Sequence, residues 1–269
     1  MVSMKSKVEM YSGTYKNYAE NIYKEIRKET YGEDFGQNSW ITIDEYRQFF
    51  SFLKLSDDTN VLEIATGSGG PSVFMVKETS CRLTGIELNE NGVHNARKLA
   101  NENGLSEKIK FIQGDASEPL PFSDNSFDVV ICIDSINHLK ERDKVLQEIR
   151  RILKTGGRLL YTDPIVVTGI LTNEEIAIRS SVGFFLFVPA GENERLLKDT
   201  GFQEIQVKDV TENIASVSKK WFTARERRKE HLLQLEEEKN CNGVQSFLQI
   251  AHQLSSQRRL SRVMYTAVK

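Results

Sequence analysis

The sequence has few cysteines, and this shortage excludes two kinds of stabilising site. Only three of its 269 residues are cysteine: Cys81, Cys132 and Cys241. Because they are odd in number and far apart, they suit neither a disulfide framework nor a zinc site. We therefore assign no metal ligand and expect reduced thiols in a cytoplasmic protein.

The sequence also lacks an excess of charge and a long apolar run. Its formal net charge is −2 at pH 7, so no overall electrostatic field would attract nucleic acid or an anionic membrane. It contains no run of eighteen apolar residues and no signal-peptide pattern at its start. We expect a protein that binds neither nucleic acid nor membranes, and its oligomeric state stays open.

Short β-rich runs alternate with amphipathic helices from residue 61 onward. This alternation is typical of a mostly parallel sheet with helices on both faces. A glycine pair, Gly156 and Gly157, is expected to end the last of these helices. The expected strands are residues 60–65, 82–88, 108–115, 127–134 and 158–163, and the expected helices are 71–79, 90–105 and 142–157.

The rest of the chain is expected to add helices to this core. Helical spacing predicts one helix over residues 15–31 and another over 43–53. Residues 214–258 are charged and helix-prone, but they contain large apolar side chains that must pack against something. The charge run 219–231 is interpreted as a solvated helix face. The expected divisions are a helical lid (1–50), an α/β core (51–213), a helical cap (214–258) and a final core strand (259–269).

The stretch ATGSGG, residues 65–70, lies at the first turn from strand to helix. In an open parallel sheet, that turn borders the ligand crevice at the carboxyl ends of the strands. Glycine allows the backbone to come close to a ligand and to adopt positive φ angles. Glu87 ends the second strand, where a carboxylate can accept both hydroxyls of a ribose. The glycine turn and Glu87 together predict a nucleotide-like ligand.

The details of this site favour one kind of nucleotide. A dinucleotide fingerprint that begins at Gly67 needs glycine or alanine at its last position, where this chain has Ser72 directly after Pro71. The pattern is therefore imperfect for a pyrophosphate site. Two acids, Glu63 and Asp115, would repel a pyrophosphate but suit a cationic amino-acid group and an adenine amine. Three hypotheses stay open: a small-molecule methyltransferase, a nicotinamide-dependent oxidoreductase, and a non-catalytic cofactor-binding protein that acts through its cap.

Four segments in succession resemble the motifs of class I S-adenosylmethionine-dependent methyltransferases: VLEIATGSGG, GIEL, GDASEPLPFSDNSFDVVICIDSINHL and IRRILKTGGRLLYTD. The chain is most similar to the sarcosine, dimethylglycine and phosphoethanolamine N-methyltransferase type. The resemblance implies a Rossmann-like, seven-stranded sheet with a reversed last strand, an N-terminal helical lid and a helical insertion. It also implies a small-molecule methyl acceptor, with an amine nitrogen favoured over a hydroxyl or a carbon.

The resemblance also implies a set of residues that bind S-adenosylmethionine. Glu63 would lie near the methionine end, Glu87 would bind the ribose and Ile133 would lie near the sulfonium. One departure is Ala65, which stands at the usual first glycine, where a methyl group can be accommodated if φ is negative. The full set is Gln37, Glu63, Gly67, Gly69, Glu87, Leu88, Asp115, Ala116 and Ile133.

Methyl transfer requires alignment, exclusion of water and sometimes removal of a proton. His138 is the candidate base, because an imidazole titrates near neutral pH. By resemblance, an N-terminal tyrosine, Tyr15 or Tyr18, would be its partner. Tyr15 is assigned to catalysis with His138, while Tyr18, Asp134 and His138 would contact the substrate. The alternative is that His138 is a structural residue bonded to the backbone.

Overall fold

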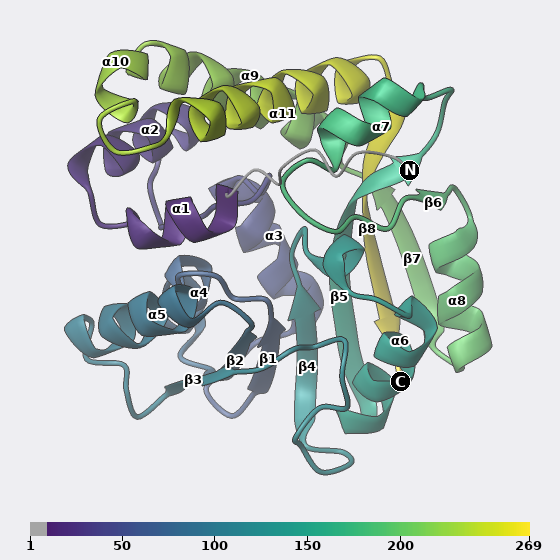
Figure 1. The fold of residues 1–269 in the computed structure, drawn as a ribbon. Coiled ribbons are helices and arrows are strands. Elements are labelled where there is room, and N and C mark those ends of the chain that lie inside the picture. The colour runs from purple at the N-terminus through teal and green to yellow at the C-terminus, as the bar shows by residue number, and fades with distance from the viewer. Residues whose placement is uncertain (1–9) are drawn as a thin grey trace.

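One eight-stranded sheet organises residues 10–269, the part of the chain that this computed structural model describes (Figure 1). Seven strands follow the order β3-β2-β1-β4-β5-β8-β7, and β6 pairs with β5. Neighbours from β3 to β5 are parallel, whereas β8 runs antiparallel to both β5 and β7. The predicted mostly parallel sheet with a reversed last strand is confirmed, although it has eight strands rather than seven because the short β6 pairs with β5. The strands are β1 (Asn60–Ile64), β2 (Arg82–Glu87), β3 (Ile109–Gln113), β4 (Phe127–Cys132), β5 (Leu153–Val167), β6 (Val188–Pro189), β7 (Gln203–Asp209) and β8 (Leu260–Val268).

Helices cover both faces of the sheet, as the alternation predicts. Successive side chains of a strand point to opposite faces. In β1, Val61 packs with three helices, α3 (Ile43–Leu53), α4 (Gly70–Thr79) and α5 (Glu90–Glu102). Its neighbour Leu62 packs on the other side with α6 (Arg142–Ile152) and α8 (Glu192–Thr200). Both faces of the central strands are therefore buried core.

The single helix predicted over residues 15–31 is wrong, because the chain breaks there into α1 (Met10–Lys16) and α2 (Asn21–Tyr31). The break has a local cause. The guanidinium of Arg27 donates to the Tyr18 carbonyl at 3.3 Å and lies 4.4 Å from the centroid of the Tyr18 ring. The carbonyl is thus satisfied by a side chain rather than by a helical amide.

The glycine pair at residues 156 and 157 does not end a helix. Helix α6 ends at Ile152, and Leu153 already pairs with Phe127 of β4. The pairing then shifts, and Gly156 adopts a φ of 75°. The glycines therefore allow an irregularity inside β5. The local sequence pattern could not show this, because it does not reveal the pairing of these residues with β4.

A helical cap lies across one end of the molecule, next to α1 and α2 (Figure 1). It consists of α9 (Thr211–Glu226), α10 (Lys229–Leu232) and α11 (Glu238–Ser256), and α7 (Asn173–Arg179) packs against α11. Apolar side chains of α2, α9 and α11 share one buried cluster. Arg228 of the cap also pairs with Glu25 and Glu29 of α2. Helix α2 and the cap therefore form one packed unit.

Two features bear on the expected division of the chain. The boundary at residue 50 falls within α3, whose buried residues pack on the sheet. The cap begins at Thr211, close to the expected residue 214.

Across residues 10–269, no helix is both long and apolar enough to cross a membrane.

Candidate active site

A cavity of about 80 Å³ lies at the carboxyl ends of β1 and β4. The glycine turn borders it on one side, and the cap and α7 border it on the other. Its wall includes Tyr11, Tyr15, Trp40, Glu63, Gly67, Ile133, Asp134, Asn137, His138, Arg179, Phe185, Trp221 and Phe247. The cavity is thus at the edge of the sheet where the sequence predicts a ligand.

Glu87 and the glycine turn hold each other in place. The Gly67 amide donates to one carboxylate oxygen of Glu87 at 2.9 Å, and the Asn89 amide donates to the other at 2.8 Å. Gly67 and Gly69 have φ angles of 57° and 77°, and a Cβ at Gly69 would lie 2.7 Å from the Cβ of Ala96. Burial raises the pKa of Glu87, although the amide hydrogen bonds oppose this shift.

Ala65 also has a positive φ, of 58°, so the negative φ that would accommodate its methyl group easily is not the one adopted. Its amide donates to the Ile86 carbonyl at 2.8 Å, which ties the turn to the end of β2. A non-glycine residue in this region brings its Cβ too close to backbone oxygen. The turn therefore holds one strained residue next to the cavity.

Glu63 is a buried acid whose charge state responds to its surroundings. Its side chain accepts a hydrogen bond from the Ser72 hydroxyl, and the residue is 3% exposed. Burial raises the pKa of Glu63 to about 7, while the bond from Ser72 lowers it. A cation placed beside this carboxyl group would favour its ionised form. The Glu63 carboxyl group is therefore suited to an ammonium ligand.

Of the other predicted cofactor residues, Ile133 lines the cavity, whereas Gln37, Leu88, Asp115 and Ala116 do not. Leu88 is 63% exposed beside Glu87, and Asp115 is exposed just after β3, where Ala116 is buried. Ile133 lies on the cavity wall with Glu63. Gln37 does not line the cavity: its side chain accepts from the Phe35 amide and donates to the Glu33 carbonyl, so it holds its own turn.

His138 has a defined tautomer. Its Nδ1 lies 2.7 Å from the Phe184 carbonyl, which can only accept, so Nδ1 carries the proton. Its Nε2 is then the acceptor for the Tyr11 hydroxyl at 2.9 Å. Burial, together with the charge of Arg179, lowers the pKa of His138 to about 4, although the hydrogen bond with the Phe184 carbonyl opposes the shift. The imidazole is therefore neutral near pH 7.

Of Tyr11, Tyr15 and Tyr18, only the first two line the cavity. Tyr11 contacts His138, whereas the Tyr15 hydroxyl lies 3.0 Å from the position of a Cβ built on Gly67. Tyr18 donates to the Gly36 carbonyl at 3.3 Å and does not line the cavity. The hydrogen bond to His138 thus comes from Tyr11 and not from Tyr15, the predicted partner.

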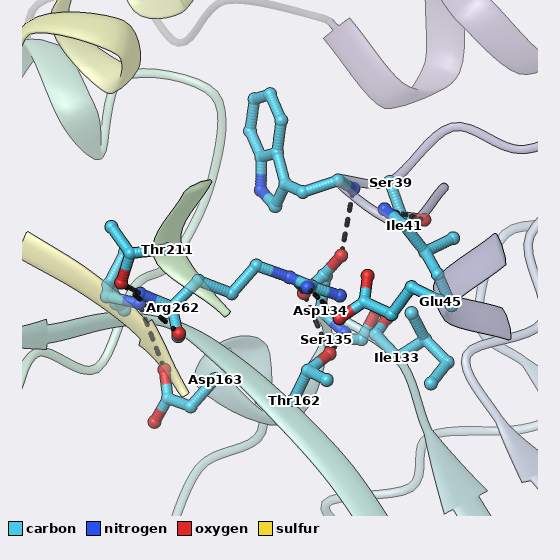
Figure 2. A network of polar contacts seen from close by, with 12 residues as sticks. Ser39, Ile41, Glu45, Ile133, Asp134, Ser135, Thr162, Asp163, Thr211 and Arg262 are labelled. Atoms are coloured by element: carbon cyan, nitrogen blue, oxygen red, sulfur yellow. Dashed lines mark hydrogen bonds and ion pairs between the residues drawn. The ribbon is translucent and has the colours of Figure 1, made fainter. Parts of the chain in front are cut away.

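Asp134 is the centre of a buried ionic network (Figure 2). Its carboxylate accepts from the Arg262 guanidinium at 2.6 Å and from the Trp40 amide at 2.8 Å. The hydroxyl of Thr162 also donates to it at 2.8 Å, and Arg262 reaches Glu45 at 2.6 Å. Although Asp134 borders the cavity, these partners occupy its oxygens, and the arrangement supports a positioning role.

Two cavity residues retain unused polar atoms. Arg179 is 1% exposed, and its Nη1 and Nη2 have no hydrogen-bond partner among the described residues. Asn137 is fully buried, and both polar atoms of its side chain lack a partner within the same part of the chain. The arginine was missed by sequence reasoning, and its one signal was a charge within the otherwise uncharged stretch IAIRSSVGFF.

The site and its sheet belong to a known family. A family model described as "Methyltransferase domain" matches residues 55–240. The chain belongs to this methyltransferase family. The family predicted from the four motifs is confirmed, and the comparisons give no support to an oxidoreductase.

Relatives of known name cover part of the chain. It is 31% identical to methyltransferase GfsG from Streptomyces halstedii over 61% of this chain and 60% of that protein. It is 28% identical to a sarcosine/dimethylglycine N-methyltransferase from Halorhodospira halochloris over 60% of this chain and 57% of that protein. The chain thus spans less than two thirds of the length of either relative.

Solved structures share the fold. Phosphoethanolamine N-methyltransferase 2 from Haemonchus contortus matches with a TM-score of 0.79 and 23% identity, over 96% of this chain and 60% of that chain. A protein from Galdieria sulphuraria, described as a putative sarcosine dimethylglycine methyltransferase, matches with a TM-score of 0.77 and 18% identity, over 84% and 83%. At these identities the likeness establishes the fold.

The strain at Ala65 can be measured. Ala65→Gly should raise the free energy of unfolding by about 0.5–1 kcal/mol, because the relief of the left-handed conformation exceeds the added chain entropy. Denaturant unfolding would test this. As a control, Ala100→Gly in α5 should lower the free energy of unfolding by about 1 kcal/mol or more. An equal loss in both variants would contradict the assigned strain.

Proposed function

We propose that the chain is an S-adenosylmethionine-dependent methyltransferase that acts on a small molecule. The observation that carries the proposal is the arrangement of Glu87 and the Gly67 amide at the carboxyl edge of the sheet, with the Glu63 carboxyl group on the cavity wall. Glu87 would accept the ribose hydroxyls, and Glu63 would face the cationic methionine end. The family match supports this reading.

The remaining cofactor contacts follow from the same placement. Exposed Leu88 would pack on the adenine, with Asp115 and Ala116 at the amine and edge of the ring. Ile133 would lie near the sulfonium. The cofactor supplies an activated methyl group, so the chain must align the acceptor and exclude water. The aromatic wall of Trp40, Phe185, Trp221 and Phe247 supplies that dry surface.

Tyr11 and His138 are suited to removing a proton from the acceptor. The Tyr11 hydroxyl already donates to Nε2 of His138, so the pair can accept a proton from a nucleophile that contacts the hydroxyl. This geometry favours Tyr11 over Tyr15 as the partner of the histidine. Tyr15 would instead contact the cofactor at the glycine turn. Asp134 would hold the cavity wall in place through its hydrogen bonds to Trp40 and Arg262.

An amine nitrogen is the favoured acceptor atom. The names of the Halorhodospira and Haemonchus proteins, which are N-methyltransferases, support this choice. We also infer cytoplasmic action on a free small molecule, without nucleic acid or membrane. An acceptor library with labelled S-adenosylmethionine would test the function. Binding without transfer to any amine, alcohol or carbon acid would favour the non-catalytic alternative.

The role of Glu87 predicts a loss of cofactor affinity. Glu87→Ala should weaken binding of S-adenosylmethionine at least tenfold, because each lost hydrogen bond to a charged acceptor costs about 1.5–3 kcal/mol. Calorimetry would measure the change, with exposed Glu90→Ala on α5 as the control. Equal affinity in wild type and Glu87→Ala would refute the assignment.

Helix α1 is expected to move when the cofactor binds. The cavity of about 80 Å³ is smaller than the roughly 300–1,000 Å³ of ligand pockets, and Tyr15 covers Gly67. Helix α2 is packed into the cap, so the motion should be confined to α1. Hydrogen exchange should slow in residues 10–16 with S-adenosylhomocysteine and stay unchanged in 21–31. Equal exchange of α1 in both states would contradict the lid.

Loss of the base should separate chemistry from binding. His138→Ala should lower kcat by about 10²–10⁴-fold with an accepted amine, while cofactor affinity stays nearly constant. Because burial lowers the pKa of His138 to about 4, the imidazole stays unprotonated as pH falls from 8 to 6, so turnover should not fall through protonation of His138 in this range. His94→Ala, exposed on α5, is the control. Full turnover of His138→Ala from pH 6 to 9 would show a structural role.

A further inference from the structure

The candidate base lies on a very short helix, which needs support from other parts of the chain. This 3₁₀ helix spans Ile136–His138, and we call it the base helix. The His138 amide donates to the Ser135 carbonyl at 2.9 Å, and the Leu139 amide donates to the Ile136 carbonyl at 3.2 Å. Because hydrogen bonds in a 3₁₀ turn have poorer geometry than those of an α-helix, this turn alone holds its side chains weakly.

Arg142, the first residue of α6, donates an outside hydrogen bond to the base helix. Its Nη2 lies 3.2 Å from the Ile136 carbonyl, which can accept this bond in addition to the one from Leu139. Both Arg142 and Ile136 are buried. A hydrogen bond in such surroundings is stronger than one in contact with water. Arg142 therefore ties the base helix to α6.

Two side chains hold the guanidinium of Arg142 in one orientation. Its Nη1 donates to Asp163 of β5 at 2.6 Å and to Asn193 of α8 at 2.7 Å. The Asn193 amide donates to the same Asp163 oxygen at 3.0 Å, so the three side chains form a closed ring. Asp163 and Asn193 are fully buried. The sheet and α8 thus fix the guanidinium, and with it the nitrogen that contacts the base helix.

This ring lies behind the cavity wall. Arg142, Asp163 and Asn193 do not line the cavity, whereas His138 does. Among the described residues, the Ile136 carbonyl is the one backbone group to which Arg142 donates. On its other side, the base is bonded to the loop after α7, because Nδ1 of His138 lies 2.7 Å from the Phe184 carbonyl. The base is therefore held between that loop and Arg142.

We propose that Arg142 is a positioning residue that keeps the imidazole of His138 aligned with the Tyr11 hydroxyl and the methyl acceptor. A misplacement of about 1 Å in an active site can lower a rate by about 10²-fold, so a support behind the base has a measurable effect on turnover. The inference rests on the proposed methyl transfer with His138 as base. It adds a residue that touches neither the cofactor nor the acceptor.

Arg142→Lys tests this role directly. The ammonium keeps a charge beside Asp163, but its single nitrogen cannot occupy the positions of both Nη1 and Nη2. With an accepted amine, kcat should fall at least tenfold, while affinity for S-adenosylhomocysteine stays within about twofold of wild type. Arg151→Lys is the matched control, because Arg151 lies on the same helix but donates to the Phe122 and Leu120 carbonyls. Full turnover of Arg142→Lys would overturn the proposal.

A double-mutant cycle separates positioning of the base from a general effect on the fold. If Arg142 acts through His138, Arg142→Lys should change kcat by less than about twofold in the His138→Ala background. A loss of equal size in both backgrounds would show that Arg142 only stabilises the fold, and would reject the positioning role. Full turnover of His138→Ala would reject it too, because there would be no base to position.

The imidazole provides a readout that does not require turnover. With ¹⁵N-labelled histidine, the Nδ1 proton of His138 should give a resolved NMR signal because it is bonded to the Phe184 carbonyl, and the signal would be assigned by its loss in His138→Ala. We expect it to shift or broaden in Arg142→Lys and to stay unchanged in Arg151→Lys. An unchanged signal in Arg142→Lys would contradict the proposal.

The two proposals fail in different ways. A chain that binds no S-adenosylhomocysteine, or methylates no acceptor, contradicts the proposed function, and the imidazole signal then tests Arg142 by itself. Equal turnover in wild type and Arg142→Lys contradicts the positioning role alone. If Arg142→Lys does not fold, Asn193→Ala takes its place, because it removes one of the two acceptors that orient Nη1. It should lower kcat severalfold, and unchanged turnover of folded Asn193→Ala would then overturn the proposal.

Discussion

The buried ion pairs of Arg262 are the interaction on which the site depends. The guanidinium is fully buried and binds Asp134 from the end of β4 and Glu45 from α3. Removing one partner of such a pair usually costs about 3–5 kcal/mol, because the other charge stays buried. The last strand therefore fixes two segments that come from distant parts of the chain (Figure 2).

The network also explains how the cavity wall keeps its shape. Asp134 has a φ of 52°, a conformation that L-residues rarely adopt. Its carboxylate is bonded to Arg262, to Thr162 and to the Trp40 amide, so the surrounding contacts fix this turn. The turn leads into the short helix of Asn137 and His138. The wall that carries the base is thus held in place through Arg262, which does not itself line the cavity.

The parts of the site that could be predicted from sequence are those built from local signals. Gly67, Gly69 and Glu87 each lie at the end of a strand or in the following turn, so an alternating pattern places them on one edge. Pairings across the fold have no local signal. Tyr11 and His138 are 127 residues apart, and Asp134 and Arg262 are 128 apart. The early end of α6 likewise depends on a tertiary partner, because Leu153 pairs with Phe127 of β4.

The order in which the chain is made has a consequence for β8. This strand lies between β5 and β7, although it is the last of the strands along the sequence. Glu45 and Asp134 are synthesised well before Arg262, from which they are 217 and 128 residues distant. Until β8 enters the sheet, the two carboxylates have no guanidinium to neutralise them and must stay hydrated. Closing such long loops is slow, so the cavity wall should be among the last parts of the molecule to become native.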